Sequence, residues 1–471
     1  MNERVLGYIT EHQAAFLEEL KGYLRFASVS ADSRFRDQTL QCAQHTADLM
    51  CDAGLTEVQI FETDGFPVVY GELMSDPSRP TVLIYGHYDV QPPDPLDLWV
   101  SGPFEPEVRD GYLFARGVSD DKGQIFCHLK AIQAWLKTTG TLPVNVKVII
   151  EGEEEVGSPN LLPFLEKHTD LLKADLALVS DTPMLGKGQP SICTSLRGLV
   201  YVEVTAKGVG GDLHSGQHGG AVPNAITGLV SVLSRLKDEN GHVTIPGFYE
   251  DVQVLSAAQR QAVAALTHSD TEYMASIGAT ALTGETGYST LERRWYRPTL
   301  DINGIWGGYM GEGSKTVIPN LAHAKFSMRL VANQNPLQIL EALRAYLPTL
   351  APAGITLTLS THTEAAFPAA VDPSHYAVKA GLKALEQAFG VPAVLQGEGG
   401  TIPVIADFKR VLGLPTVLMG FNLPDDNIHA PNERFLLANF FGGIEASAYF
   451  LNGLHPTPNP SPFPMGIERG A

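Results

Sequence analysis

Residues 81–89 read TVLIYGHYD, an apolar run that ends in a histidine and an aspartate. The run Thr81–Tyr85 is rich in β-branched and aromatic residues, which is typical of a strand that is apolar on both faces. His87 and Asp89 lie two residues apart, so in extended chain their side chains point the same way. The stretch therefore predicts a buried strand with an imidazole and a carboxylate just past its carboxyl end.

Similar apolar runs occur before and after this strand, at Val58–Phe61, Pro67–Leu73, Val146–Ile150, Ala174–Val179 and Pro415–Phe421. Helical periods separate several of them, most clearly over Ile125–Leu136, and a further helix is expected over Val5–Leu24. Alternating strands and helices predict an α/β layer with a mostly parallel sheet that is covered by helices on both sides. Such folds place their chemistry at the carboxyl ends of the strands.

The middle of the chain has a different order of elements. We expect strand 198–207, helix 223–236, strands 300–305 and 322–330, helix 337–347 and strand 355–359. The order β-α-β-β-α-β is that of a ferredoxin-like domain. We therefore expect an inserted α+β lid or dimerisation domain over 197–364, which interrupts one domain made of 1–196 and 365–471. An insert over about 246–298 has no function that its pattern indicates, and the proline-rich tail after His455 is typical of irregular chain.

Length and charge limit the possible functions. A chain of 471 residues is too long for a single hydrophobic core, so two or three domains are expected. Its net charge of -19 repels phosphate backbones and anionic lipids, which argues against nucleic-acid and membrane partners. The four cysteines form no C-x-x-C pair, and neither a signal peptide nor a membrane-spanning run is evident. We expect a soluble cytoplasmic protein with reduced thiols.

Further acidic and imidazole side chains follow the predicted strands or precede a helix: Asp120 and Asp121, the run Glu153–Glu155, Asp181 and His429. Each has an ordinary interpretation, since a His-x-Asp is commonly a surface turn, aspartates cap helices, and acidic runs are usually solvated. However, the glutamate run follows a strand that should be buried, where unpaired carboxylates cost several kcal/mol each. A bound cation would relieve that cost.

Five of these residues together form a nitrogen and oxygen ligand set without sulfur: His87, Asp120, Glu155, Asp181 and His429. Such ligands suit zinc, and also manganese or cobalt, in an open catalytic site. Five ligands exceed the need of one tetrahedral ion, whereas two ions about 3.5 Å apart with a bridging carboxylate and a bridging water would use them all. A spare carboxylate beside the ligand glutamate could then act as general base. The residues alone do not decide whether Asp120 or Asp121 is the ligand. They also do not decide whether Glu154 or Glu155 is the base.

Four motifs, in this order and spacing, resemble the signatures of the M20 metallopeptidase family: GHYDVQP at 86–92, RGVSDDKG at 116–123, EEEVGS at 153–158 and HAPNE at 429–433. The likeness is to the dipeptidase branch, the carnosinase-like and cytosolic non-specific dipeptidases, and it covers nearly the whole chain. It implies a zinc-peptidase-like catalytic domain with an inserted lid. It also implies two divalent metal ions per subunit, Zn²⁺ above all, with Mn²⁺ or Co²⁺ as alternatives.

The resemblance assigns the ligands. It implies that Asp120 bridges the two ions, that His87 and Asp181 complete one site, and that Glu155 and His429 complete the other.

The resemblance also implies catalytic roles outside the ligand set. Glu154 looks like the general base, and Asp89 looks like the group that orients His87. The segment Asp212–Gly216 is similar to the family segment whose histidine, here His214, reaches the active site of the neighbouring subunit and helps to polarise the scissile carbonyl. The family often has arginine directly before this segment, whereas this chain has Gly211.

Substrate contacts are implied in the same way. Arg329 matches the arginine that clamps the substrate's C-terminal carboxylate, a task that suits the guanidinium fork. Gly400 and Thr401 belong to what looks like the glycine-rich substrate loop, whose backbone N–H groups meet that carboxylate. Asn320 is a further candidate contact. Without the resemblance, each would be an ordinary loop or surface residue.

We therefore expect a homodimeric two-metal hydrolase that cleaves dipeptides or short peptides with a free C-terminal carboxylate. An N-acyl- or N-succinyl-amino-acid deacylase of the same family is the main alternative, because only the substrate pocket would differ. A catalytically silent metal-binding or scaffold protein is disfavoured, since no ligand and no base is missing. A phosphoesterase is disfavoured because no basic cluster lies near the motifs.

Overall fold

The computed structural model describes residues 3–361 and 365–454, so the predicted irregular tail after His455 lies outside the described residues. The chain forms two compact units. The first contains the residues up to Ile192, Pro373–Ala393 and the residues from Val411 onward, and the second contains Cys193–Asp372 and Val394–Arg410. The assignment of a catalytic domain to 1–196 and 365–471, and of a lid to 197–364, stays a prediction.

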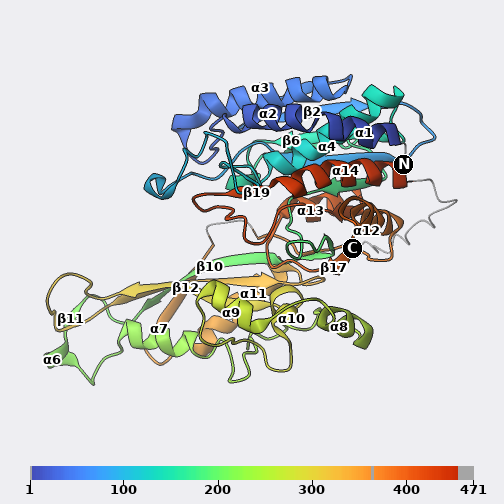
Figure 1. The fold of residues 1–471 in the computed structure, drawn as a ribbon. Coiled ribbons are helices and arrows are strands. Elements are labelled where there is room, and N and C mark those ends of the chain that lie inside the picture. The colour runs from blue at the N-terminus through green and yellow to red at the C-terminus, as the bar shows by residue number, and fades with distance from the viewer. Residues whose placement is uncertain (1–2, 362–364, 455–471) are drawn as a thin grey trace. The chain divides into compact units, whose positions relative to one another are not determined.

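An eight-stranded sheet forms the centre of the α/β layer (Figure 1). Its strands, in spatial order, are β1 (Gln59–Phe61), β2 (Val68–Leu73), β6 (Asn145–Glu151), β3 (Thr81–His87), β7 (Leu176–Val179), β18 (Thr416–Leu418), β8 (Ser191–Cys193) and β17 (Val394–Gln396). Neighbours from β6 to β18 run parallel, while β1, β2 and β6 pair antiparallel. Every residue of β3, β6 and β7 is buried, so both faces are covered at the centre. The predicted α/β class is confirmed.

The helices of the first unit are α1 (Glu3–Glu11), α2 (Gln13–Leu24), α3 (Arg36–Ala53), α4 (Lys122–Thr139), α5 (Leu161–Lys167), α12 (Tyr376–Phe389) and α14 (Leu437–Gly453). The single helix predicted over Val5–Leu24 is wrong in one respect, because the structure breaks it into α1 and α2 at His12. There the ring Nδ1 donates to the carbonyl of Tyr8 at 2.9 Å. A small sheet of β4 (Glu107–Arg109), β5 (Tyr112–Phe114) and β19 (Arg434–Leu436) completes this unit.

The second unit contains a four-stranded antiparallel sheet in the order β12-β14-β10-β15. Its strands are β12 (Thr299–Gly307), β14 (Leu321–Leu330), β10 (Gly198–Lys207) and β15 (Thr356–Ser360), and its main helices are α7 (Ala225–Leu233) and α11 (Pro336–Tyr346). Side chains of β10 and β14 alternate between buried and half-buried, so one face of the sheet supplies the apolar core under the helices. The order agrees with the predicted ferredoxin-like arrangement.

Smaller elements of this unit are β9 (Ser195–Leu196), β11 (Leu213–His214), α6 (Ser215–His218), β13 (Val317–Ile318), β16 (Ala369–Ala370) and α13 (Pro403–Asp407). The insert folds into α8 (Ala257–Ala264), α9 (Asp270–Ile277) and α10 (Thr290–Trp295). A buried ion pair joins Arg297 to Glu285, with an Nε–Oε2 distance of 2.6 Å, and a second pair joins Arg260 on α8 to Glu292 on α10. Both partners of each ion pair lie within the insert.

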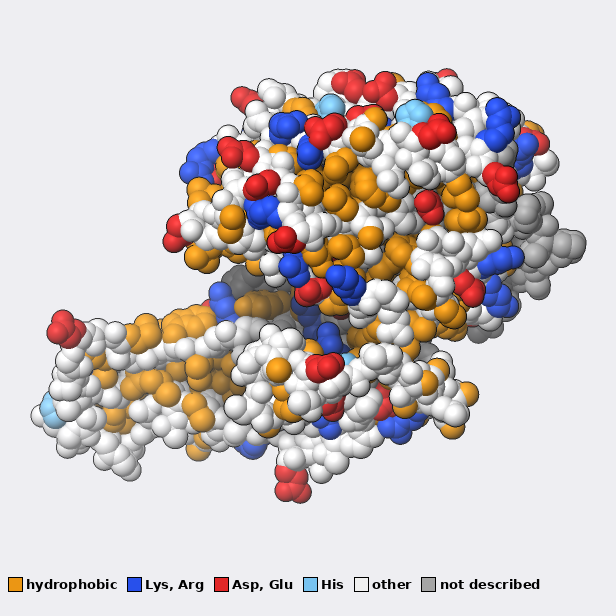
Figure 2. Space-filling model, viewed as in Figure 1, with side chains coloured by type: hydrophobic (Ala, Val, Ile, Leu, Met, Phe, Trp, Pro, Cys, Tyr) orange, Lys and Arg blue, Asp and Glu red, His pale blue; other side chains and the backbone are white. Residues whose placement is uncertain are grey.

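Acidic and basic side chains are interspersed over the face shown in Figure 2, and they do not gather there into one basic patch. Within the described ranges, none of the helices combines the length and the apolar character that crossing a bilayer requires.

Candidate metal centre and substrate-binding residues

Five predicted ligands converge at the carboxyl ends of the parallel strands. His87, Asp120 and Asp181 form one potential ligand set, and Asp120, Glu155 and His429 form another, with the ligand atoms of each set within 4.8 Å of one another. Asp120 belongs to both sets. Its Oδ1 lies 3.0 Å from His87 Nε2, and its Oδ2 lies 2.9 Å from His429 Nε2. One carboxylate thus turns each oxygen toward a different imidazole, which is the arrangement that a bridging ligand needs.

The electrostatics of this cluster favour bound cations. Burial raises the pKa of Asp181 and of Glu154 well above their ordinary values, and nearby carboxylates add to both rises. Burial raises the pKa of Glu155 as well. Hydrogen bonds to Asp120 and Glu155 raise the pKa of His429 to about 10. Buried carboxylates outnumber the imidazoles, so a donor set of nitrogen and oxygen atoms with excess negative charge fits divalent cations.

Asp120 behaves in the opposite way. Burial acts to raise its pKa, but hydrogen bonds from His429 and His87 outweigh burial and hold the pKa well below its ordinary value. The neighbouring Asp121 is in neither ligand set, and burial raises its pKa to about 8. A Cβ atom at Gly86 would lie 2.6 Å from Asp121 Oδ2, so glycine is needed where α4 approaches β3. The geometry therefore favours Asp120 over Asp121 as the shared ligand.

Asp89 organises the glutamate turn. It lies just past β3, and its carboxylate accepts hydrogen bonds from Glu154 N at 3.2 Å, Glu155 N at 3.1 Å and Ser30 Oγ at 2.6 Å. Its Oδ1 is 3.4 Å from His87 Nδ1, whereas its backbone oxygen is 3.1 Å from the same nitrogen. Asp89 is thus in place to orient His87, and it also fixes the turn that carries Glu154 and Glu155.

Three supporting residues were not assigned from the sequence. Gln91 donates through Nε2 to Glu155 Oε2 at 2.7 Å, and Glu433 accepts hydrogen bonds from the segment that carries Asp120. Both belong to motifs with recognisable spacing, GHYDVQP and HAPNE. Ser30 has no such signal, because it lies 59 residues from its partner Asp89.

In the second unit, Arg329 and Thr401 lie together. Arg329 Nη1 donates to Thr401 Oγ1 at 2.6 Å, and that hydroxyl donates to the carbonyl of Arg197 at 2.6 Å. Arg197, which sequence reasoning missed, donates through Nε to Gly399 O at 2.9 Å. Burial lowers the pKa of Arg197 to about 10, with a further lowering by Arg329. Among the described residues, no carboxylate forms an ion pair with either guanidinium. The pair can therefore accept an anionic ligand.

The N–H groups of the glycine-rich loop are already engaged. Gly399 N and Gly400 N donate to Glu398 Oε1 at 2.6 and 3.1 Å. The loop thus binds a carboxylate, as the resemblance implies, but in the structure this carboxylate is its own. A substrate that used the same N–H groups would have to displace the Glu398 side chain.

His214 and Asn320 lie elsewhere in this unit. His214 is exposed, and its strand pairs with β13, which precedes β14, whereas Arg329 lies near the other end of β14. Asn320 immediately precedes β14. At about 3.3 Å per residue, the ten residues of β14 separate the two groups by about 30 Å. The structure does not bring His214 and Asn320 to Arg329 within one chain.

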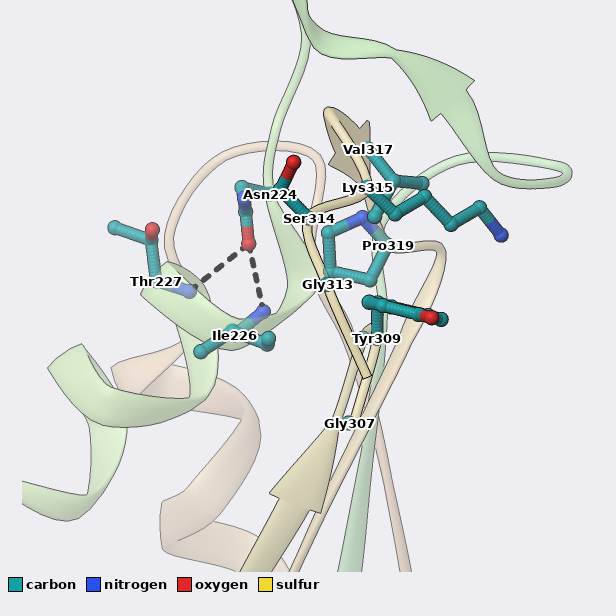
Figure 3. Close-up of a pocket in the computed structure, with 11 residues that line it drawn as sticks. Asn224, Ile226, Thr227, Gly307, Tyr309, Gly313, Ser314, Lys315, Val317 and Pro319 are labelled. Carbon is teal, nitrogen blue, oxygen red and sulfur yellow. Dashed lines mark hydrogen bonds between the residues drawn. The ribbon is translucent and has the colours of Figure 1, made fainter. Parts of the chain in front are cut away.

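Local hydrogen bonding suits His214 to donation. Its Nδ1 accepts from Gly216 N at 3.0 Å, so the proton of the neutral ring is at Nε2. An added Cβ at Gly211 would meet no atom within 4 Å, so the loop has room for the arginine that the family often has there. A pocket of about 410 Å³ is lined by Asn224, Tyr309 and Lys315 among others. These residues are drawn in Figure 3. The pocket includes Val317, the strand partner of His214.

The sequence matches a known family over most of its length. The profile of peptidase family M20/M25/M40 matches residues 83–453. The chain belongs to this family. It is therefore a metallopeptidase, and the predicted resemblance is confirmed.

Relatives and a solved structure support the same assignment. A Cys-Gly metallodipeptidase of Schizosaccharomyces pombe is 31% identical over 471 residues, covering 96% of this chain and 98% of the relative. The human Beta-Ala-His dipeptidase is 31% identical, covering 95% and 92%. The crystal structure of human carnosine dipeptidase 1 superposes with a TM-score of 0.80 at 30% identity, covering 96% of this chain and 98% of that one. The similarity extends to nearly the full length of these proteins, so it includes both units.

Proposed function

We propose that this M20 metallopeptidase is a dinuclear metal-dependent dipeptidase. The observation that carries the proposal is the shared position of Asp120 in two ligand sets, one with His87 and Asp181 and one with Glu155 and His429. Two similar proteins, each 31% identical over nearly the whole chain, are a Cys-Gly metallodipeptidase and a Beta-Ala-His dipeptidase, which favours small peptides as substrates.

The chemistry follows from the proposed roles of the residues. Two divalent cations bound by these ligands would polarise the scissile carbonyl and lower the pKa of a water molecule. Glu154 takes the proton of the attacking water and passes it to the leaving amine, a task for a carboxylate whose pKa burial has raised. Asp89 keeps the Glu154 turn in place through its two backbone hydrogen bonds.

Substrate selection falls to the second unit in this proposal. Arg329 binds the C-terminal carboxylate, with Thr401 holding the guanidinium and Gly400 offering its N–H group once Glu398 moves. Arg197 adds positive charge beside them. A free carboxylate on the substrate therefore strengthens binding, so a dipeptide should be cleaved faster than its neutral amide.

We also infer a homodimer in which His214 and Asn320 act in the site of a second copy. The support is their separation from Arg329 by the length of β14. His214, protonated at Nε2, would donate to the oxyanion that forms at the substrate carbonyl.

The substrate class can be tested on metal-depleted protein that is reloaded in turn with Zn²⁺, Mn²⁺ and Co²⁺. The panel contains dipeptides including Cys-Gly, β-alanyl dipeptides including β-Ala-His, longer peptides, and N-acyl and N-succinyl amino acids. We expect fast turnover of dipeptides with a free carboxylate and much slower turnover of their C-terminal amides. Turnover confined to the N-acyl compounds would replace the dipeptidase with a deacylase.

The homodimer can be tested by mixing two inactive variants, Glu154→Gln and His214→Ala, after subunit exchange. A mixed dimer would contain one site with both native residues, so about one quarter of the native activity should return in an equimolar mixture. Activity that stays at the level of the separate variants would contradict a role for His214 in the partner's site. Sedimentation of the native protein as a monomer would contradict it independently.

A further inference from the structure

The Glu433 carboxylate is completely buried beside the segment that carries Asp120. It lies four residues after His429, at the end of the same loop. Both of its oxygens are used by donors of one short segment: Oε2 accepts from Arg116 Nη1 at 2.7 Å and Gly117 N at 2.9 Å, and Oε1 accepts from Ser119 N at 2.9 Å and Asp120 N at 3.1 Å. One side chain thus satisfies three backbone N–H groups and one guanidinium.

Other hydrogen bonds join the same two segments. Ala115 N donates to the backbone oxygen of Glu433 at 3.1 Å. The Ser119 hydroxyl lies 3.2 Å from Asp426 Oδ2 and donates to Arg434 O at 2.8 Å. The loop over 426–434 therefore contacts both ends of the segment over 115–120, through Ala115 at one end and Ser119 near the other. The Glu433 side chain bonds to the same segment.

These contacts fix the positions of two proposed ligands of one ion relative to each other. Asp120 lies at the end of the segment that Glu433 binds, and His429 lies in the loop that carries Glu433. Their side chains meet at 2.9 Å between Asp120 Oδ2 and His429 Nε2. A shift of either segment would move one ligand away from the other. A ligand site that is fixed before binding gains affinity because less order is lost on binding.

A simpler interpretation is that the Arg116 and Glu433 pair stabilises the fold and nothing else. A buried ion pair is weak evidence for stability, because desolvation offsets the attraction between the charges. Three of the four donors, moreover, are backbone groups of the segment that ends at Asp120. The main effect of the Glu433 carboxylate is therefore to fix the backbone of this segment, and neutralising the charge of Arg116 is the smaller effect.

We propose, resting on the function proposed above, that Glu433 is a positioning residue that fixes the segment of Asp120 against the loop of His429, so that both are set to bind the same metal ion. Both oxygens of Glu433 are already engaged by Arg116 and the backbone of this segment. Glu433 acts through the backbone of Asp120.

The test is the metal affinity of Glu433→Gln, measured by competition between the metal-depleted protein and a chromophoric chelator for Zn²⁺ alone and for Mn²⁺ alone. The amide NH₂ of glutamine would face backbone N–H donors, so the segment should loosen although every ligand remains. Affinity for the more weakly bound ion should fall by about 10- to 100-fold, the usual effect of removing a group that orients a ligand. Activity at limiting metal should fall in parallel and recover with excess metal.

Glu292→Gln is the matched control, since Glu292 is also a buried glutamate that accepts from a backbone N–H, Ser289 N, and from an arginine, Arg260. It lies in α10, and its replacement should leave metal affinity unchanged. Glu433→Asp keeps the charge with a shorter reach and covers the case in which the glutamine variant does not fold.

Native metal affinity in a folded Glu433→Gln or Glu433→Asp protein would overturn the proposal. This readout needs no substrate, so it is separable from the proposed function. A native protein that binds two ions and cleaves no dipeptide would refute the dipeptidase assignment and leave the role of Glu433 intact.

Discussion

The carboxylates around Asp120 and the guanidinium groups of Arg197 and Arg329 are both charged groups held partly or wholly away from water. In the first region, acidic side chains face imidazoles in a dense cluster, where Asp120 is within hydrogen-bond distance of two histidines. In the second, two arginines bond to a hydroxyl and a backbone carbonyl, and no described carboxylate forms an ion pair with them, although Asp301 near both and Glu398 near Arg197 favour the charged guanidinium. The first region calls for cations and the second for an anion.

The difference separates chemistry from recognition. If the acidic cluster performs the reaction and the arginine pair selects the substrate, then changes in the first should abolish turnover of every substrate. Changes in the second should act only on substrates that carry a free carboxylate. The following variants probe that distinction in order of decreasing effect.

Glu154→Gln should cause the largest loss, about 10²- to 10⁴-fold in kcat, because the general base is removed while the proposed ligands remain. Metal content, measured by elemental analysis after dialysis, should stay near that of the native enzyme. A variant that keeps full turnover would remove Glu154 from the mechanism, and one that loses its metal would make it a ligand instead.

Arg329→Met should lower kcat/KM for free dipeptides by about 10- to 100-fold, since a charge-assisted hydrogen bond contributes about 1.5–3 kcal/mol. Metal content should be unchanged. Any slow hydrolysis of the matching dipeptide amide should not fall further. Arg344→Met is the control, because Arg344 pairs with Glu341 on α11, outside the proposed site. An equal loss on acid and amide would assign Arg329 to the fold of this unit.

Thr401→Val should have a smaller effect, about 5-fold in kcat/KM, because it removes one neutral hydroxyl between Arg329 and the Arg197 carbonyl. The loss should appear in KM more than in kcat. A large drop in kcat with an unchanged KM would move Thr401 from recognition to chemistry and would blur the distinction between the two regions.

His128 tests the acid sensitivity of the first unit without touching activity directly. It is buried between Ser180 and Ser447, and burial lowers its pKa to about 3. Below the pKa of about 6.5 that this histidine has in the unfolded chain, only the unfolded chain binds the proton. The free energy of unfolding therefore decreases by about 1.4 kcal/mol for each unit by which the pH is lowered, until the folded pKa is reached. In His128→Gln this part of the acid sensitivity should vanish, as urea midpoints at pH 7 and pH 5 would report. An unchanged pH dependence would contradict the burial effect.

The sequence predicted the parallel strands, the ferredoxin-like order and the convergence of the ligands, because buried strands and strand-end carboxylates have local signals. Two features lacked such signals, namely the helix break at His12 and the role of Arg197. The break at His12 depends on one ring bonding to the preceding turn, and Arg197 becomes relevant only because residues about 200 positions later fold against it. The residues alone left Asp120 and Asp121 open, and the position of the Asp120 carboxylate between both imidazoles favours Asp120 as the shared ligand.

The central claim is that Asp120 bridges two metal ions in one subunit. Its most direct test is anomalous diffraction from crystals of the Zn²⁺-loaded enzyme, recorded on both sides of the zinc absorption edge. The account predicts two peaks about 3.5 Å apart on either side of the Asp120 carboxylate, one beside His87 and Asp181 and the other beside Glu155 and His429. A single peak at full occupancy, or a pair of peaks away from Asp120, would contradict it.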